Sequence, residues 1–193
     1  MITAGIDIGN QSIKVVILEK NEILSAQSLV ISGDVNTVSQ KTFEIALKEG
    51  RISRETISAI LVTGVGKEKV TLANSYATEL SCHTKGAHYY FPSVRTVIDI
   101  GAENCRVSKC DQEGRLTDFA MNDKCATGTG VFLETVAKML ETNLADMGAL
   151  SLKSKRKLTL TTTCAVFAES EIVTEIHRGS LKEEIMWGAH GSV

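Results

Sequence analysis

Two stretches of the sequence decide the fold: DIGNQSIKV at residues 7–15 and DIGAENCRV at residues 99–107. They align without gaps, and each follows a short apolar run and precedes a second run rich in β-formers. Each also places a basic residue, Lys14 or Arg106, seven positions after its aspartate. Two unrelated β-turns are the alternative, because Asp and Gly are common in turns. The shared context and the shared cation favour an internal duplication.

The apolar periodicity around both copies predicts a similar order of elements. Before residue 93 we expect strands over 2–6, 13–18, 23–30 and 57–63, and helices over 37–48 and 67–77. After it we expect strands over 94–100, 104–110, 115–121 and 157–163, and helices over 129–141, 143–150, 166–177 and from 181 onward. Gly50 is expected to stop the first helix.

The composition excludes several classes of protein. Hydrophobic residues make up 43% and charged residues 23% of the 193, which are ordinary globular proportions. A formal net charge of −2 disfavours nucleic acid as a partner, and no apolar run approaches the ~18 residues that span a bilayer. The N-terminus lacks the basic region of a signal peptide, so we expect a cytoplasmic protein. The last helix runs to Val193 without a stop signal, so we expect an N-terminal piece of a longer protein.

Both repeats carry the chemistry of a phosphate site. A glycine in the turn lets the main chain approach an anion, and successive backbone N–H groups can cradle it. Asp7 and Asp99 suit Mg²⁺ bound through water, and Lys14 can neutralise phosphate. Two such hairpins facing each other could clamp a triphosphate. The candidate nucleotide ligands in these hairpins are Gly5, Gly9, Asn10, Gln11, Ser12, Lys14, Gly101 and Ala102.

A P-loop is excluded as the alternative phosphate site. The sequence has a Gly-Lys pair at Gly66-Lys67. This pair lacks both the earlier glycine and the following Ser or Thr of a P-loop. A third glycine-rich segment, Thr127-Gly128-Thr129-Gly130, precedes a predicted helix whose N-terminus would favour negative charge.

Two cysteines stand where predicted helices begin. Cys125 lies beside the third glycine-rich segment, and Cys164 lies between a predicted strand and a predicted helix. A helix N-terminus favours thiolate, the form that binds metal. Two thiolates do not complete an iron–sulfur cluster, whereas two chains about a two-fold axis would supply four. Burial as small hydrophobic residues is the alternative, and it is the reading we prefer for Cys82, Cys105 and Cys110.

The motifs together resemble the BadF/BadG/BcrA/BcrD ATPases, which include activators of 2-hydroxyacyl-CoA dehydratases and ATP-binding subunits of benzoyl-CoA reductase. The resemblance runs along the whole chain and is most specific at MNDKCATGTG (residues 121–130) and TCAVFAESE (residues 163–171), with further support at DIG (7–9), LSCH (80–83) and VIDIG (97–101). It implies an actin/Hsp70/sugar-kinase-like (ASKHA) α/β fold. Its duplicated βββαβα subdomains, residues 1–92 and 93–193, would hold nucleotide in a cleft.

The resemblance also implies cofactors and partners. They are ATP with Mg²⁺, and a [4Fe–4S] cluster shared between two subunits through Cys125 and Cys164 of each. The second subunit would be an identical chain or a homologous one. The electron would come from ferredoxin or flavodoxin and pass to an acyl-CoA dehydratase or to the catalytic subunits of benzoyl-CoA reductase. ATP binding and hydrolysis would reorient the helices next to the cluster.

The chain departs from the family pattern at two places. Activators commonly have Gly-Gly-Gln-Asp where this chain has Gly101-Ala102-Glu103-Asn104. Glu103 is therefore a candidate catalytic base, with Asp7 and Asp99 as the other catalytic candidates, and the variant looks closer to the benzoyl-CoA reductase type. The glycine-rich adenosine segment found near the family's C-terminus is missing.

Acids on the helix after Cys164 are candidates for holding ribose. We expect Glu169 and Glu171 in the first turn of that helix. For Glu169 a ribose role and simple complementarity with the helix dipole are equally compatible with the sequence, and for Glu171 we favour the dipole.

Three functions remain open from the sequence. The first is an ATP-driven electron donor with an iron–sulfur cluster. The second is a small-molecule kinase of the same fold, such as an amino-sugar kinase, which would need neither Cys125 nor Cys164. The third is a non-catalytic regulatory protein with a degenerate nucleotide site. The matching positions of the two cysteines favour the first.

Overall fold

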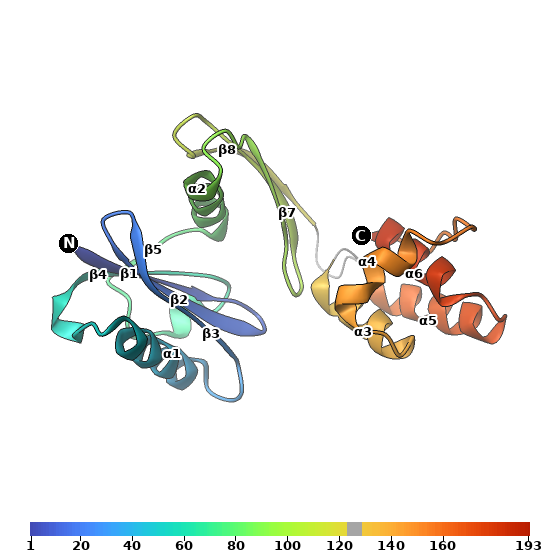
Figure 1. Cartoon of the computed structure of the whole chain (residues 1–193), viewed down its shortest axis with the longest axis horizontal. Helices are drawn as coiled ribbons and strands as arrows, with labels where there is room; N and C mark the ends of the chain where they lie inside the picture. The colour runs from blue at the N-terminus through green and yellow to red at the C-terminus, as the bar shows by residue number, and fades with distance from the viewer. Residues whose placement is uncertain (123–128) are drawn as a thin grey trace. The chain divides into compact units, whose positions relative to one another are not determined.

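The computed structural model describes residues 1–122 and 129–193 (Figure 1). The chain divides into two compact units, and each is described by itself. Unit 1 comprises residues 1–95 and 109–117, and unit 2 comprises residues 96–108 and 118–193. No helix in the described ranges is long and apolar enough to cross a membrane.

Unit 1 is built on a five-stranded sheet in the order β3-β2-β1-β4-β5. Its strands are β1 (Ile2–Ile8), β2 (Ser12–Glu19), β3 (Glu22–Val30), β4 (Ile57–Thr63) and β5 (Ser75–Tyr76). The predicted three-strand meander is confirmed, because β1 pairs antiparallel with β2 and β2 with β3. β4 lies parallel to β1 on its other side. The registers set Asp7 opposite Lys14 on one side and opposite Thr63 on the other.

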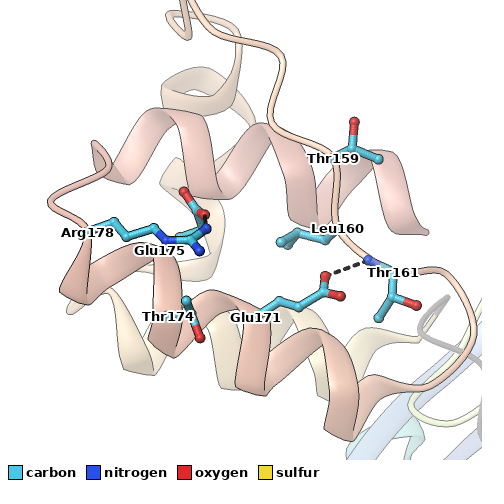
Figure 2. Close-up of a pocket in the computed structure, with 7 residues that line it drawn as sticks. All are labelled: Thr159, Leu160, Thr161, Glu171, Thr174, Glu175 and Arg178. Carbon is cyan, nitrogen blue, oxygen red and sulfur yellow. Dashed lines mark hydrogen bonds and ion pairs between the residues drawn. The ribbon is translucent and has the colours of Figure 1, made fainter.

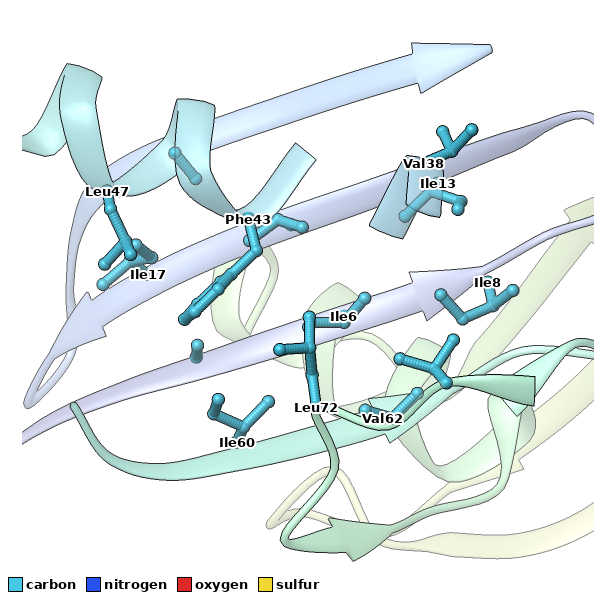
Figure 3. Close-up of a cluster of buried hydrophobic side chains, with 14 residues drawn as sticks. Ile6, Ile8, Ile13, Ile17, Val38, Phe43, Leu47, Ile60, Val62 and Leu72 are labelled. Carbon is cyan, nitrogen blue, oxygen red and sulfur yellow. The ribbon is translucent and has the colours of Figure 1, made fainter. Parts of the chain in front are cut away.

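One helix covers the core of this sheet. α1 (Val35–Gly50) begins at Asp34, whose carboxylate accepts the Thr37 N–H at 2.8 Å, and these hydrogen bonds lower the pKa of Asp34. Figure 3 shows Phe43 and Leu47 pointing from α1 toward Ile6 and Ile17 of the sheet. All four side chains are buried, and burying each contributes about 2 kcal/mol. Because buried residues alternate along β1 and β2, one face of both strands packs against α1.

Two local predictions in unit 1 are wrong, and one helix was not predicted. α1 includes Gly50, and the left-handed residue that ends it is Arg51, at φ 55°. Residues 67–77 form no α-helix but a 3₁₀ turn, η2 (Lys67–Lys69), and strand β5. Here the chain runs beside β4, because the backbone N–H and side chain of Asn74 both bond to Ile60. The sequence also does not reveal α2 (Glu79–Tyr90), which begins at Thr78.

The turn between β7 and β8 packs on α2 within unit 1. Lys85 donates to the Glu113 carbonyl at 2.5 Å, and His88 Nε2 donates to the Gln112 carbonyl at 2.9 Å. Gly114 has a positive φ of 72°, and an added Cβ would lie 2.6 Å from His88 Cβ. His88 and Lys85 therefore hold this turn against α2.

Unit 2 contains a three-stranded sheet and a helical cluster. The sheet has the order β6-β7-β8, from β6 (Thr96–Ile100), β7 (Cys105–Cys110) and β8 (Leu116–Met121). The helices are α3 (Gly130–Met139), α4 (Met147–Ser151), α5 (Ala165–His177) and α6 (Lys182–Ser192), with two further 3₁₀ turns in the chain at Arg54–Thr56 (η1) and Leu144–Asp146 (η3). Their core contains Phe132, Val136, Ile172, Ile185 and Met186, all at most 1% exposed.

The predicted strand over residues 157–163 does not form. Leu160 is instead buried in the helical core, and its side chain lies against Gly188 of α6. The next backbone N–H, of Thr161, donates to Glu171 of α5 and not to a neighbouring strand. The segment is therefore a connection held by the burial of Leu160 against α6 and by the Glu171 side chain of α5.

Candidate functional site

The turn between β1 and β2 gathers the first group of predicted site residues. The Gly9 N–H donates to the Ser12 carbonyl at 3.1 Å, which closes the turn over Asn10 and Gln11. Lys14 donates to Asp7 at 3.2 Å, and the two side chains are 47% and 29% exposed. An added Cβ on Gly9 would lie 3.0 Å from the Ser12 carbonyl and 3.1 Å from Lys14 Nζ. A side chain at position 9 would therefore be crowded, and the Lys14 ammonium remains accessible.

A second turn supports the end of β1. The Gly66 N–H donates to the Ile8 carbonyl at 3.2 Å. Gly64 has φ 95°, and an added Cβ would lie 2.3 Å from the same carbonyl oxygen. The sequence predicts a turn at Gly64-Val65-Gly66 but does not by itself connect this turn with the site. The connection could have been predicted from the strands, because neighbouring parallel strands bring their carboxyl ends to one edge of a sheet.

Cys82 of α2 lies at this edge. Burial of its thiol, with a smaller contribution from the Asp7 carboxylate, raises the pKa of Cys82. A half-buried thiol with a raised pKa is mostly protonated, which agrees with the packing role expected for it.

The second repeat forms the same turn with a different ion pair. The Gly101 N–H donates to the Asn104 carbonyl at 2.7 Å, and Arg106 donates to Asp99 at 3.1 Å. The Arg106 side chain is 7% exposed, compared with 47% for Lys14. Arg106 is therefore held inside the unit, whereas Lys14 faces solvent. Glu103 is exposed at the tip of the turn.

Helix α3 begins directly on this second turn. The Gly130 N–H donates to the Gly101 carbonyl at 2.8 Å, and the Val131 N–H donates to the Ala102 carbonyl at 3.0 Å. An added Cβ on Gly130 would lie 3.0 Å from the Gly101 carbonyl. The turn's own carbonyls thus accept the N–H groups of Gly130 and Val131, and the phosphate role predicted for Thr127-Gly128-Thr129-Gly130 stays a prediction. Thr129 is the buried N-cap residue of α3, and Cys125, Thr127 and Gly128 lie outside the described residues.

Cys164 is the N-cap residue of α5. It is half-buried with an extended backbone, at φ −152° and ψ 131°, and its carbonyl accepts the Ala168 N–H at 3.0 Å. The thiol thus stands at the positive end of a 13-residue helix, where thiolate is favoured. Among residues 1–122 and 129–193, no three His, Cys, Asp or Glu side chains come together as a metal site.

A pocket of about 520 Å³ lies between α5 and the connection before it (Figure 2). Its lining residues are Thr159, Leu160, Thr161, Glu171, Thr174, Glu175 and Arg178. Glu171 accepts the Thr161 N–H at 2.8 Å. Hydrogen bonds from Ser180 and Arg178 lower the pKa of Glu175, which is therefore ionised at neutral pH.

The two acids of α5 are not where the sequence suggested. The helix begins at Ala165, and its first turn contains no acid, so Glu169 and Glu171 belong to the second turn. Only Glu171 of the two lines the pocket. The acid to which we gave the smaller chance of a ligand role is thus the one beside the cavity.

These geometries can be set beside known proteins. Residues 4–193 match the BadF/BadG/BcrA/BcrD ATPase family. The chain belongs to this family. It is 39% identical over 193 residues to the 2-hydroxyisocaproyl-CoA dehydratase activator of Clostridioides difficile, covering 100% of this chain and 73% of the relative. A benzoyl-CoA reductase component from Thauera aromatica is 29% identical over 197 residues, with 100% and 70% covered.

Solved structures of the family confirm the ASKHA fold. Component A of the (R)-2-hydroxyglutaryl-CoA dehydratase of Acidaminococcus fermentans matches with a TM-score of 0.90 and 35% identity, covering 100% of this chain and 74% of that one. The 2-hydroxyisocaproyl-CoA dehydratase activator of Clostridium difficile, with bound ADPNP, matches with a TM-score of 0.87 and 38% identity, covering 100% and 72%. The chain is therefore homologous to dehydratase activators. The overall identity is higher to this dehydratase activator than to the benzoyl-CoA reductase component, and the type of the Ala102-Glu103-Asn104 variant stays a prediction.

Proposed function

We propose that this protein is an ATP-hydrolysing electron donor that activates a 2-hydroxyacyl-CoA dehydratase or a related CoA-thioester reductase. In this proposal a [4Fe–4S] cluster is shared between two copies of the chain, or between the chain and a homologous subunit. Ferredoxin or flavodoxin would reduce it. The support is the homology to activators, together with the geometry of two phosphate-type turns and a cysteine at the N-cap position of α5.

The first hairpin supplies the phosphate contacts. Lys14 is exposed and makes one ion pair, to Asp7, so a phosphate can compete for the ammonium. Release of Asp7 leaves its carboxylate to accept hydrogen bonds from water on Mg²⁺. In the second hairpin, Arg106 holds Asp99 through an ion pair, and Glu103, at the exposed tip, would accept a proton from the attacking water.

The pocket on α5 is our proposed adenosine site. Its volume of about 520 Å³ lies in the ordinary range for small-molecule sites. One Glu171 oxygen is taken by Thr161, and the carboxylate has further acceptor capacity for a ribose hydroxyl. We therefore assign the ribose role to Glu171 in place of Glu169.

Cys164 favours the function of an electron donor over that of a kinase. A thiol at a helix N-cap suits a metal ligand, and a kinase has no use for it. When bound, the cluster supplies one low-potential electron. Val166 and Phe167, the residues that follow at the start of α5, are 61% and 63% exposed. These apolar side chains next to Cys164 give a second chain a surface to cover.

The hydrogen bonds at the start of α3 couple nucleotide to this centre. Because the Gly101 and Ala102 carbonyls cap α3 directly, a displacement of the second turn displaces the helix. Cys125 precedes that helix by five residues in the sequence.

The deciding experiment measures iron and acid-labile sulfide in protein prepared without oxygen, with EPR of the dithionite-reduced sample. We expect about four irons per two chains. The cluster should be lost in Cys125→Ser and Cys164→Ser, and kept in Cys110→Ser, whose buried sulfur hydrogen-bonds to the Val94 carbonyl. An iron-free wild-type protein that still binds ATP contradicts the proposal and favours a kinase or a regulatory protein.

A further inference from the structure

Lys67 follows a turn that is fastened to the end of β1. The Gly66 N–H donates to the Ile8 carbonyl, and Gly64 fits over the same peptide only because it has no side chain. Lys67 is the first residue of η2 and directly follows Gly66, which makes this contact. Its backbone is therefore fixed beside the β1 end that carries Asp7 and leads into Gly9.

The surroundings of Lys67 differ from those of its neighbours. Lys67 is half-buried, whereas Glu68 and Lys69 are exposed. Lys67 follows β4 in the chain, and Thr63, the last residue of β4, pairs with Asp7. The backbone of Lys67 therefore lies on the β4 side of Asp7.

Lys14 approaches Asp7 from the opposite strand. It pairs with Asp7 across the β1–β2 ladder, whereas Thr63 pairs with Asp7 across the β1–β4 ladder. Within the described part of the chain no ion pair involves Lys67, whereas Lys14 is bonded to Asp7. A triphosphate carries more negative charge than Lys14 alone neutralises, so a second cation on the open side of the turn has a clear use.

We propose that Lys67 is a second phosphate-binding cation, which contacts the terminal phosphate of ATP from the β4 side while Lys14 contacts it from the β2 side. The proposal rests on the proposed function, because it requires that the first hairpin binds phosphate. No sequence motif predicts this role for the turn at residues 64–66, because Gly66-Lys67 is not part of a P-loop.

Titration of ATP, ADP and AMP with Mg²⁺ tests this role by calorimetry. Lys67→Gln is expected to weaken ATP binding about tenfold and ADP binding less, and to leave AMP binding within about twofold of wild type. Lys69→Gln, in the same turn but exposed, is the matched control and should change none of the three. Lys67→Arg should restore the preference for ATP. Lys67→Met keeps the length of the aliphatic side chain, so nucleotide binding can still be compared with wild type if the glutamine variant does not fold.

The outcomes separate this inference from the proposed function. Equal losses for ATP and AMP in a folded Lys67 variant, or no loss beyond that of Lys69→Gln, overturn the role of Lys67 and leave the hairpin assignment standing. A wild-type protein that binds no nucleotide overturns both.

Discussion

At the scale of residues, the two repeats use one ion-pair pattern for different purposes. Lys14 and Asp7 form an exposed pair, whose contribution to stability is about 0–1 kcal/mol. Arg106 is almost fully buried against Asp99, and breaking such a pair leaves a charge without its partner. The sequence places a cation seven residues after each aspartate. The difference in burial between the two pairs is a property of the folded chain.

A pair of acids on α5 tests the adenosine pocket. Glu171→Gln should weaken ATP, ADP and AMP binding by a similar factor, about five- to tenfold, because the ribose is common to all three. Glu169→Gln is the control on the same helix, and it should leave binding unchanged because Glu169 does not line the pocket. Calorimetric titration of both variants decides the assignment. A loss of binding confined to Glu169→Gln returns the ribose role to Glu169.

At the scale of elements, turns built on glycine hold the site together. The turn after β4 touches the end of β1, and the turn after β6 caps α3. In both places a backbone carbonyl of the Asp-x-Gly repeat accepts a hydrogen bond from a glycine N–H. Each hairpin is therefore braced by an element that lies far from it in sequence.

The close contact at Gly64 predicts a specific cost in stability. Gly64→Ala should lower the free energy of unfolding of unit 1 by about 3 kcal/mol, since it combines an unfavourable φ with a clash against Ile8. Gly33→Ala also has a positive φ but open space around it, so its cost should be about 1 kcal/mol. Urea unfolding followed by far-UV circular dichroism compares the two variants. Equal costs would mean that the end of β1 yields to the added methyl group.

At the scale of the whole molecule, each unit has a core of its own. Unit 1 buries the inward face of β1 and β2 beneath α1, and unit 2 buries the facing sides of its helices. Within the described residues a single chain assembles no metal site of three or more ligands. In our proposal the cluster takes ligands from two chains, and the exposed Val166 and Phe167 beside Cys164 are apolar side chains that a second chain would cover.

This dependence predicts that removal of the cluster separates the subunits. Sedimentation velocity should show dimers for the iron-loaded protein and monomers after treatment with a chelator under oxidising conditions. Cys164→Ser should be monomeric from the start, and Cys110→Ser should behave as the wild type. Dimers that persist in iron-free protein would show that the apolar surface, and not the cluster, joins the chains.

Much of the fold follows from the sequence because it is encoded locally. The strands before α1 alternate buried and exposed side chains, and the two Asp-x-Gly turns are written in adjacent residues. The start of α5 just after Cys164 is visible in the same way, since a strongly apolar helix follows it. These features were predicted close to where they lie, and so were the family and the ASKHA fold.

Contacts between distant residues decided the rest. The path of residues 67–77 depends on Asn74 bonding to Ile60, and that of residues 157–163 depends on Leu160 entering a helical core. Neither contact leaves a local period in the sequence. The choice of Glu171 over Glu169 was likewise made by the packing of α5, because the direction of a side chain is set by the surface against which its helix is buried. The sequence by itself determined which chemical groups this protein carries, and the tertiary structure decided which of them face a ligand.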